Sequence, residues 1–416
     1  MKKILFLLFI TPLSYALTIH CGHVLDVKTG KILDNKLIQT ANQRFVKIED
    51  FKQQSVDVDL SNFYCLPGLM DMHTHLSFEF SKKSYTEKYQ LNEADYAFIS
   101  ALYAKRTLKA GFTTVRDLGD VFNVTIALKK AINNGTTQGP RIFTAGKAIA
   151  TTGGHADPSN GYRQGLMPNP GPKLGVINGS AQAAQAVRQR YQDGSDVIKI
   201  TATGGVLSQA SSGDNAQFNK TELDSIIQTA KDYGFKVAAH AHGKEGMKRA
   251  IIAGVASIEH GTYADDEIRK LMKKHGTYLV PTLIAGDWVT AKSKIKGYFP
   301  EVVAKKAATI GPIIAGAFAK AYQQGVKIAF GTDSGVSAHG DNAKEFALMV
   351  KAGMKPLAAI QAATINAADL LGQSANLGII ERGKYADLIA VENNPLEDIT
   401  TLENIKAVIK AGKKEF

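Results

Sequence analysis

The sequence is poor in cysteine and tryptophan. Its 416 residues include only two cysteines, Cys21 and Cys65, and one tryptophan, Trp288. Two thiols are too few for a thiolate zinc site, and two cysteines in a chain this long do not make a disulfide scaffold. An oxidising compartment would permit a bond between them. The state of Cys21 and Cys65 therefore stays open at this point.

Patterns typical of nucleotide and nucleic-acid binding are missing. No GxGxxG or Walker A sequence follows any expected strand. The formal net charge is +12, but the lysines are scattered in short pairs and form no basic block with interleaved aromatic residues. Nucleic acid is therefore not an expected partner. A solvated basic surface explains the charge, and attraction to anionic substrates or envelope surfaces is the alternative.

Apart from the N-terminus, no segment approaches the apolar length of a membrane-spanning helix. The chain begins MKKILFLLFITPLSYALT, with two lysines, an apolar run over Ile4–Ile10, and small residues at positions 14 and 16. This order is typical of a secretory signal peptide over residues 1–16, cleaved after Ala16. It predicts an exported protein, periplasmic or secreted, with no stable membrane span after cleavage. An uncleaved anchor is the alternative.

The remaining chain divides into strand-rich ends and an alternating middle. Residues 17–66 and 378–416 contain short alternating runs broken by turn signals, which predicts a small β-sandwich built from both ends. Residues 67–377 alternate apolar strands with amphipathic helical stretches, several ending in glycine. This α/β pattern favours a (β/α)8 TIM barrel over an open doubly wound sheet. The eight expected strands are GLMDMHTH, TTVRDLG, RIFTAG, DVIKITATGG, KVAAHAHG, SIEHG, TYLVPTL and VKIAFGTD.

Polar side chains gather where these strands end, which is where barrels carry their chemistry. Residues two apart in a strand share a face, so the imidazoles of His73 and His75 point the same way. Taken singly, such residues are usually structural, and Asp333 would serve as a helix cap. Together on one rim, imidazole and carboxylate groups without a thiolate suit zinc or another divalent first-row metal. The set comprises His73, His75, Lys199, His240, His242, His260 and Asp333.

Lys199 is unusual because it lies among Val197, Ile198 and Ile200, in an apolar, β-branched run. One interpretation is that the ammonium group of this lysine reaches solvent at the strand end. The other is a desolvated amine, neutral near pH 7, which reacts with carbon dioxide to form a carbamate. A carbamate has two oxygens and can bridge two metal ions about 3.5–4 Å apart.

Several segments resemble a known family in order and sequence. LPGLMDMHTHL, VIKI, VAAHAHG, SIEHGTY and FGTDSG, followed by GKYADLIAV and IKAVIKAGK, resemble the metal-dependent amidohydrolase superfamily over nearly the whole mature chain. TTGGHAD, HAHGKEGMKRAI and SIEHGTYADDE resemble in particular its Xaa-Pro and Xaa-Arg dipeptidase (prolidase-like) subgroup, which is also similar to ochratoxinase.

The resemblance implies two divalent metal ions, zinc above all, and carbon dioxide for the carboxylation of Lys199. His73 and His75 would hold the first ion together with Asp333. His240 and His260 would hold the second, with Lys199 bridging as a carbamate. His242 is the alternative ligand on its strand, and otherwise lies above the metals and stabilises an oxyanion.

The implied reaction is attack of a metal-bridging hydroxide on the amide bond of a dipeptide or an N-acyl amino acid. Asp333 would take the proton from water and pass it to the leaving amine. The candidates for binding the substrate carboxylate are His155 and Arg163 in the Gly/Pro-rich stretch 145–180, and Tyr263 beside His260. Glu259 is expected to point away from the site and to be structural. The substrate is a small molecule, the leaving residue stays open, and a homo-oligomer is compatible with the sequence.

Two other functions remain open. A ring-opening or deaminating, imidazolonepropionase-like amidohydrolase would use one metal and a glutamate proton shuttle, without a bridging lysine. The other is an exported metal-binding or surface-interaction protein without catalysis, and the intact set of ligands together with Asp333 argues against it.

Overall fold

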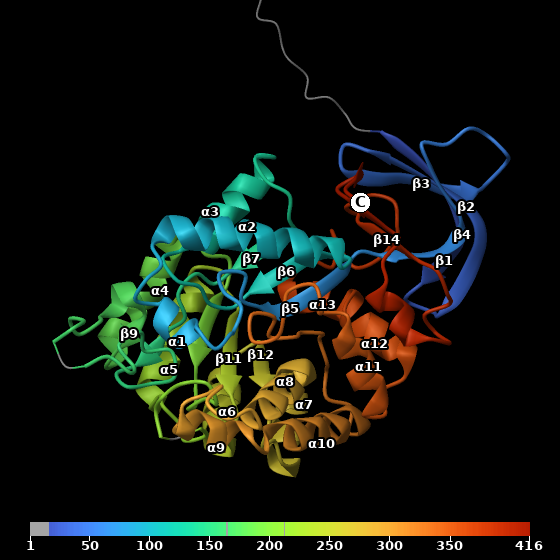
Figure 1. Cartoon of the computed structure of the whole chain (residues 1–416). Helices are drawn as coiled ribbons and strands as arrows, with labels where there is room; N and C mark the ends of the chain where they lie inside the picture. The colour runs from blue at the N-terminus through green and yellow to red at the C-terminus, as the bar shows by residue number, and fades with distance from the viewer. Residues whose placement is uncertain (1–15, 164, 212) are drawn as a thin grey trace, which may run out of the picture.

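The computed structural model describes residues 16–163, 165–211 and 213–416. The predicted signal peptide, except Ala16, lies outside these residues. The fold is α/β, with a sheet at one side of a larger part made of parallel strands and helices (Figure 1).

The two chain ends build one sheet. Its seven strands lie in the order β16-β15-β14-β4-β1-β2-β3. Figure 1 shows blue N-terminal strands beside red C-terminal β14. The strands are β1 (Leu17–Asp26), β2 (Lys31–Ala41), β3 (Arg44–Asp50), β4 (Val58–Pro67), β14 (Leu388–Val391), β15 (Ala407–Lys410) and β16 (Lys413–Lys414). The sequence predicted that both chain ends build one unit, but it predicted a β-sandwich. Backbone pairing instead joins these strands in a single sheet. Alternation reveals which face is buried, not how strands are joined.

Cys21 and Cys65, whose pairing the sequence left open, form a disulfide between β1 and β4. Both cysteines are fully buried in the apolar cluster of this sheet. The bond closes a loop between residues 44 apart in the chain. It therefore restricts the unfolded chain and ties the two parallel neighbours of the sheet together.

Removing this bond should destabilise the protein. We expect the Cys21→Ala/Cys65→Ala double variant to lose about 2–4 kcal/mol of unfolding free energy, because the unfolded chain regains the entropy of an open loop. Urea unfolding followed by circular dichroism measures the change. Each single variant breaks the same bond, so the two single effects should not add. An unchanged urea midpoint in the double variant would contradict the expectation.

The middle of the chain forms parallel strands. A three-stranded sheet contains β5 (Leu69–Thr74), β6 (Phe112–Asp117) and β7 (Arg141–Thr144). A four-stranded sheet contains β10 (Ile198–Thr201), β11 (Val237–Ala241), β12 (Ser257–His260) and β13 (Tyr278–Val280). Seven of the eight expected strands therefore form.

The eighth expected strand, residues 326–333, makes only isolated parallel bridges to its surroundings. Ile328 pairs with Leu279 of β13, and Ser334, just beyond the segment, pairs with Thr74 of β5. A further bridge joins Ile149 to Ile200 of β10. The insertion after β7 contains two short paired strands, β8 (Ala150–Thr151) and β9 (Val176–Ile177).

Helices follow most of the parallel strands, and several end as the sequence predicted. Gly254 caps the C-terminus of α6 and Gly276 that of α7, both with the positive φ that glycine adopts without strain. α5 begins at a capping box formed by Asn219 and Glu222. The helices are α1 (Ser84–Glu87), α2 (Glu93–Lys109), α3 (Val124–Asn133), α4 (Ser180–Asp193), α5 (Lys220–Asp232), α6 (Lys244–Ala253), α7 (Asp266–His275), α8 (Leu283–Ser293), α9 (Glu301–Ala307), α10 (Ile310–Gln323), α11 (Lys344–Lys351), α12 (Pro356–Ala362) and α13 (Ile365–Leu371), with short 3-10 turns at Pro172–Leu174 and Ile399–Glu403.

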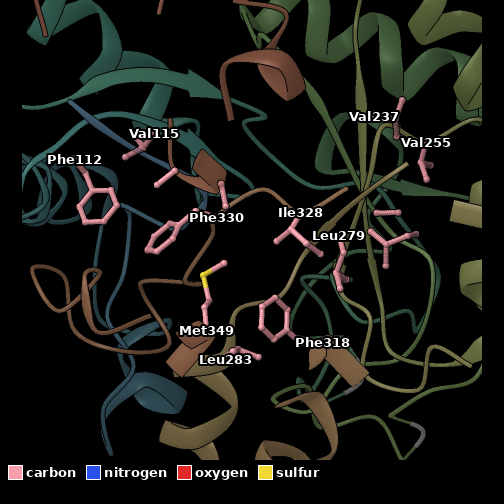
Figure 2. Packing of buried hydrophobic residues seen from close by; sticks show 14 of the residues in the cluster. Phe112, Val115, Val237, Val255, Leu279, Leu283, Phe318, Ile328, Phe330 and Met349 are labelled. Carbon is pink, nitrogen blue, oxygen red and sulfur yellow. The ribbon is translucent and has the colours of Figure 1, made fainter. Parts of the chain in front are cut away.

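The largest apolar core lies between the parallel strands and these helices (Figure 2). Phe330 packs between Phe112 and Phe346, with ring centroids 5.4 and 4.3 Å away. No apolar segment of membrane length was expected beyond the N-terminus, but Glu301–Gln323 is long and apolar enough to cross a membrane, so that prediction is wrong. Ile314 and Phe318 of this segment belong to the core. Core helices pass the same length test, so this segment is weak evidence for a membrane span.

Candidate metal centre and active site

The predicted metal ligands meet at the carboxyl ends of the parallel strands. All six of them, together with His242 and His155, line one cavity of about 560 Å³. They come from β5, β10, β11, β12 and the segment after residue 332, which are far apart in the chain. The strand arrangement therefore assembles the group that the sequence predicted.

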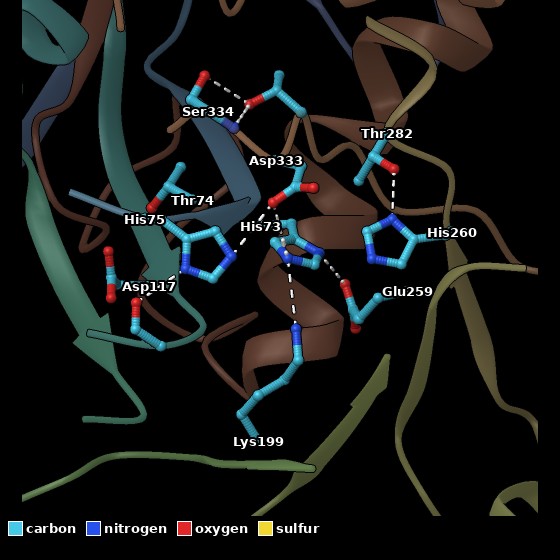
Figure 3. Close-up of polar contacts among 12 residues, drawn as sticks. His73, Thr74, His75, Asp117, Lys199, Glu259, His260, Thr282, Asp333 and Ser334 are labelled. Carbon is cyan, nitrogen blue, oxygen red and sulfur yellow. Dashed lines mark hydrogen bonds and ion pairs between the residues drawn. The ribbon is translucent and has the colours of Figure 1, made fainter. Parts of the chain in front are cut away.

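Asp333 faces His73 of β5 and His75, which follows that strand (Figure 3). Its Oδ1 lies 3.4 Å from Nε2 of His73 and 3.2 Å from Nε2 of His75. Burial by itself would raise the pKa of Asp333, but the two histidines and Lys199 outweigh it, so the pKa lies below its usual value. Asp333 is therefore a carboxylate at neutral pH.

Two overlapping groups of side chains could each hold a cation. His73, His260 and Asp333 have ligand atoms within 4.8 Å of one another, and so do His240, His242 and His260. Because His260 belongs to both groups, the two positions adjoin. The geometry leaves His240 and His242 equivalent as ligands in the second group, as the sequence did.

Three of the histidines each bind an oxygen through one ring nitrogen. Three rings donate to oxygens that can only accept: His73 Nδ1 to Glu259 Oε2 at 3.0 Å, His75 Nδ1 to Gly119 O at 2.8 Å, and His240 Nε2 to Gly204 O at 3.0 Å. In a neutral ring the other nitrogen carries a lone pair, as a metal ligand must. Burial by itself would lower the pKa of His75, but the contact of its Nε2 with Asp333 Oδ1, at 3.2 Å, outweighs burial and raises that pKa. Burial also lowers the pKa of His73, His240 and His260 well below the usual value, which keeps these rings neutral. This donor set fits divalent metal ions.

Lys199 reaches the same place from β10. Its Nζ lies 3.3 Å from Nε2 of His73, a nitrogen rather than a carboxylate oxygen (Figure 3). The side chain is 4% exposed, and burial lowers its pKa to about 8. The fraction of neutral amine near neutral pH is therefore larger than for an ordinary lysine, and the neutral amine is the state that reacts with carbon dioxide.

Glu259 does not point away from the site, so the predicted direction is wrong, while its contacts are with other side chains and it is not among the residues that line the cavity. It is fully buried, accepts a hydrogen bond from His73, and pairs with Arg116 Nη2 at 2.8 Å. The reason is the backbone of His260, whose φ of 71° ends the alternation of the strand. Glu259 and His260 can therefore both face His73, whose ring centroid lies 5.1 Å from that of His260. Asp333 and Thr282, at φ 58° and 55°, show the same left-handed conformation, which is frequent at functional sites.

The three predicted substrate residues differ in placement. His155 lines the cavity and stacks on His240, with centroids 4.3 Å apart, and its Nδ1 has no partner among the described residues. Tyr263 lies in a second cavity of about 180 Å³ that it shares with His242. Arg163 is exposed and is not among the residues that line the main cavity.

Sequence reasoning missed two cations of the cavity wall, Lys88 and Lys147. Lys88 Nζ lies 4.3 Å from the ring centroid of Tyr162 and donates to Asn160 O. Lys147 belongs to the insertion 145–180, and only its place in that loop pointed to a role. Most other wall residues are apolar, among them Phe78, Phe80, Val289, Ile310 and Ile314.

Imidazoles, a carboxylate and a desolvated lysine at the ends of parallel strands are the groups that a metal-dependent hydrolase uses. The chain belongs to the amidohydrolase family, whose model matches residues 64–414. It is an enzyme that cleaves C–N bonds, and its substrate is a small molecule.

Three similar proteins indicate the subgroup within this family. A solved Xaa-Pro dipeptidase with methionine bound in its active site is 51% identical, with a TM-score of 0.93, over 96% of this chain and 99% of that one. The ochratoxinase of Aspergillus niger is 37% identical over 369 residues, 84% of this chain and 74% of the relative. A solved prolidase complexed with N-methylphosphonate-L-proline is 29% identical, with a TM-score of 0.86, over 96% of this chain and 99% of that one. These relatives support the dipeptidase and ochratoxinase subgroup.

Proposed function

We propose that the protein is a binuclear amidohydrolase that hydrolyses dipeptides or N-acyl amino acids, of the Xaa-Pro or Xaa-Arg/Lys dipeptidase type. The observation that carries this proposal is Lys199, buried 3.3 Å from His73 in a cavity lined by the other five candidate ligands. A carbamate between two cations explains a buried lysine at that place better than an ammonium does, because the nearest polar atom is a ring nitrogen rather than a carboxylate oxygen.

His73, His75 and Asp333 would hold one divalent ion, and His240 and His260 the other. Zinc suits these nitrogen and oxygen ligands, and carboxylated Lys199 would supply the shared anionic oxygens. Two such ions lower the pKa of water and polarise a carbonyl, which is the chemistry that amide hydrolysis needs.

The chain's own groups handle the protons. Asp333 accepts the proton of the attacking water and gives it to the leaving amine. Burial lowers the pKa of His242 to about 4, so its ring is neutral. Its Nδ1 lies 2.7 Å from the hydroxyl of Thr262. If that hydroxyl donates, Nε2–H is left to donate to the developing oxyanion.

The cavity favours a substrate with an apolar side chain and a carboxylate. The apolar wall suits an uncharged acyl or amino-acid side chain. His155, Lys88 and Lys147 offer polar or cationic groups on the same cavity for the carboxylate, and Tyr263 approaches from the smaller one. Exposed Arg163 would require movement of its loop to take part.

The proposal includes the barrel architecture of the protein and its export from the cytoplasm. The bridges at Ile149, Ile328 and Ser334 support closure of the parallel strands into a (β/α)8 barrel over residues 67–377. Residues 17–66 and 378–416 would form the accessory domain. Export after cleavage at Ala16 is supported by the disulfide, since such bonds persist in oxidising compartments.

Removal of metal tests the proposed function. We expect the purified, zinc-loaded protein to contain two ions per chain and to hydrolyse dipeptides or N-acyl amino acids. Dialysis against a chelator should reduce the rate at least about 100-fold, since metal stabilisation amounts to several kcal/mol. Zinc with bicarbonate should restore it.

The choice of substrates separates the alternatives. One ion per chain and activity only on cyclic amides would favour the ring-opening or deaminating enzyme. Inertness toward peptides, N-acyl amino acids and cyclic amides would favour a metal-binding protein. Full activity of the metal-free protein would overturn the proposal.

A further inference from the structure

Two adjacent lysines of α9 have different surroundings. Lys305 is 75% exposed and pairs with Glu301 one turn earlier, at 2.7 Å. Lys306 turns inward, and its Nζ donates to three backbone carbonyls: Gly205 at 2.7 Å, Ser208 at 2.8 Å and Ala210 at 2.8 Å. Three acceptors use all the donors that an ammonium has. Lys306 therefore binds three backbone carbonyls of the segment after β10 with a single ammonium group.

The segment that Lys306 holds adjoins the candidate metal centre. Gly204 O accepts the hydrogen bond from His240 Nε2 at 3.0 Å. The next residue supports a second ring, because a methyl group on Gly205 would lie 2.2 Å from His155 Cε1. His155 in turn stacks on His240. The Gly204–Gly205 peptide therefore contacts both imidazoles, one by a hydrogen bond and one by packing.

Two consecutive glycines do not hold an orientation by themselves, since glycine has the widest choice of backbone conformations. Here the orientation comes from outside contacts. Gly204 N donates to Asn215 O at 3.0 Å, and Tyr85 donates to Leu207 O at 3.0 Å. Lys306 is the charged member of this set, and charge-assisted hydrogen bonds are the strong ones.

We propose that Lys306 is a positioning residue, which fixes the backbone at Gly204–Gly205. This backbone orients His240 so that its Nδ1 faces a cation, and it keeps the ring of His155 stacked on His240. This inference rests on the proposed function in one respect, that His240 holds an ion. Lys306 itself lies outside the catalytic groups and acts through the carbonyls it binds.

The test uses Lys306→Met in the full chain loaded with zinc, with Lys305→Met as the matched control. Transfer of Zn²⁺ to a coloured chelator is followed in time. One of the two ions should leave about tenfold faster or more from Lys306→Met, as expected when a group that orients a ligand is lost. The control should release both ions at the wild-type rate. The kcat of Lys306→Met should fall with little change in KM, because ligand orientation rather than substrate binding is affected.

A rescue experiment addresses general unfolding. Lys306→Ala lacks the last three carbons and the ammonium, so n-propylammonium should enter and slow zinc release again. Tetramethylammonium has no N–H donor and should not. Equal release rates in Lys306→Met and wild type, or no difference between the two amines, would overturn the inference. Zinc transfer needs no substrate, so a wild type that holds two ions and hydrolyses no amide would overturn the proposed function alone.

Discussion

Replacing Lys199 with methionine should abolish nearly all activity and remove metal from the centre. We expect kcat/KM to fall about 10³-fold, because losing the bridging anion removes several kcal/mol of charge stabilisation. Methionine is close to lysine in length and fills the buried position beside His73 without a charge. The metal content should fall from two ions per chain to one or none.

Two measurements separate this effect from unfolding. After incubation with ¹³C-bicarbonate, the wild type should show a carbamate signal in ¹³C NMR that the variant lacks. Lys248→Met is a suitable control, since Lys248 is exposed and pairs with exposed Glu267 on the surface. Two tightly bound ions and full activity in Lys199→Met would contradict the bridging role.

The sequence predicted which side chains gather in one cavity, because strand geometry is simple. His73 and His75 share a face by the twofold period, and all six candidate ligands line one cavity because parallel strands end together. The prediction failed at Glu259, where the left-handed φ of His260 interrupts that period. The sequence SIEHG does not predict a positive φ at its histidine, because a positive φ is uncommon for residues other than glycine.

Long-range contacts were the other limit. β14 pairs with β4 across more than 300 residues, and no local pattern specifies that these strands join in one sheet. The hydrogen bond from Lys306 to Gly205 O depends on how two segments pack against each other. In the sequence, Lys306 looks like one member of an exposed lysine pair. The placement of Arg163 outside the cavity wall likewise follows from loop packing.

The last prediction concerns Asp333, the proposed proton carrier. Asp333→Asn should lower kcat about 10³-fold, within the usual range for loss of a general acid–base group. Asparagine is the right replacement for two reasons. It keeps an oxygen at Oδ1, and it tolerates the left-handed φ of 58° at this position better than other residues do. What it cannot do is accept the proton of water.

Metal content decides how the loss is interpreted. The oxygen of asparagine is a weaker ligand, so the variant is assayed with excess zinc and its bound ions are counted. With two ions bound, the low kcat comes from the missing carboxylate rather than from an empty centre. Asp341→Asn provides the control, because Asp341 is half-exposed and pairs with Lys344 on α11. If Asp333→Asn bound two ions and kept kcat within tenfold of wild type, another group would have to carry the proton, and the neutral ring of His242 would be the first to examine.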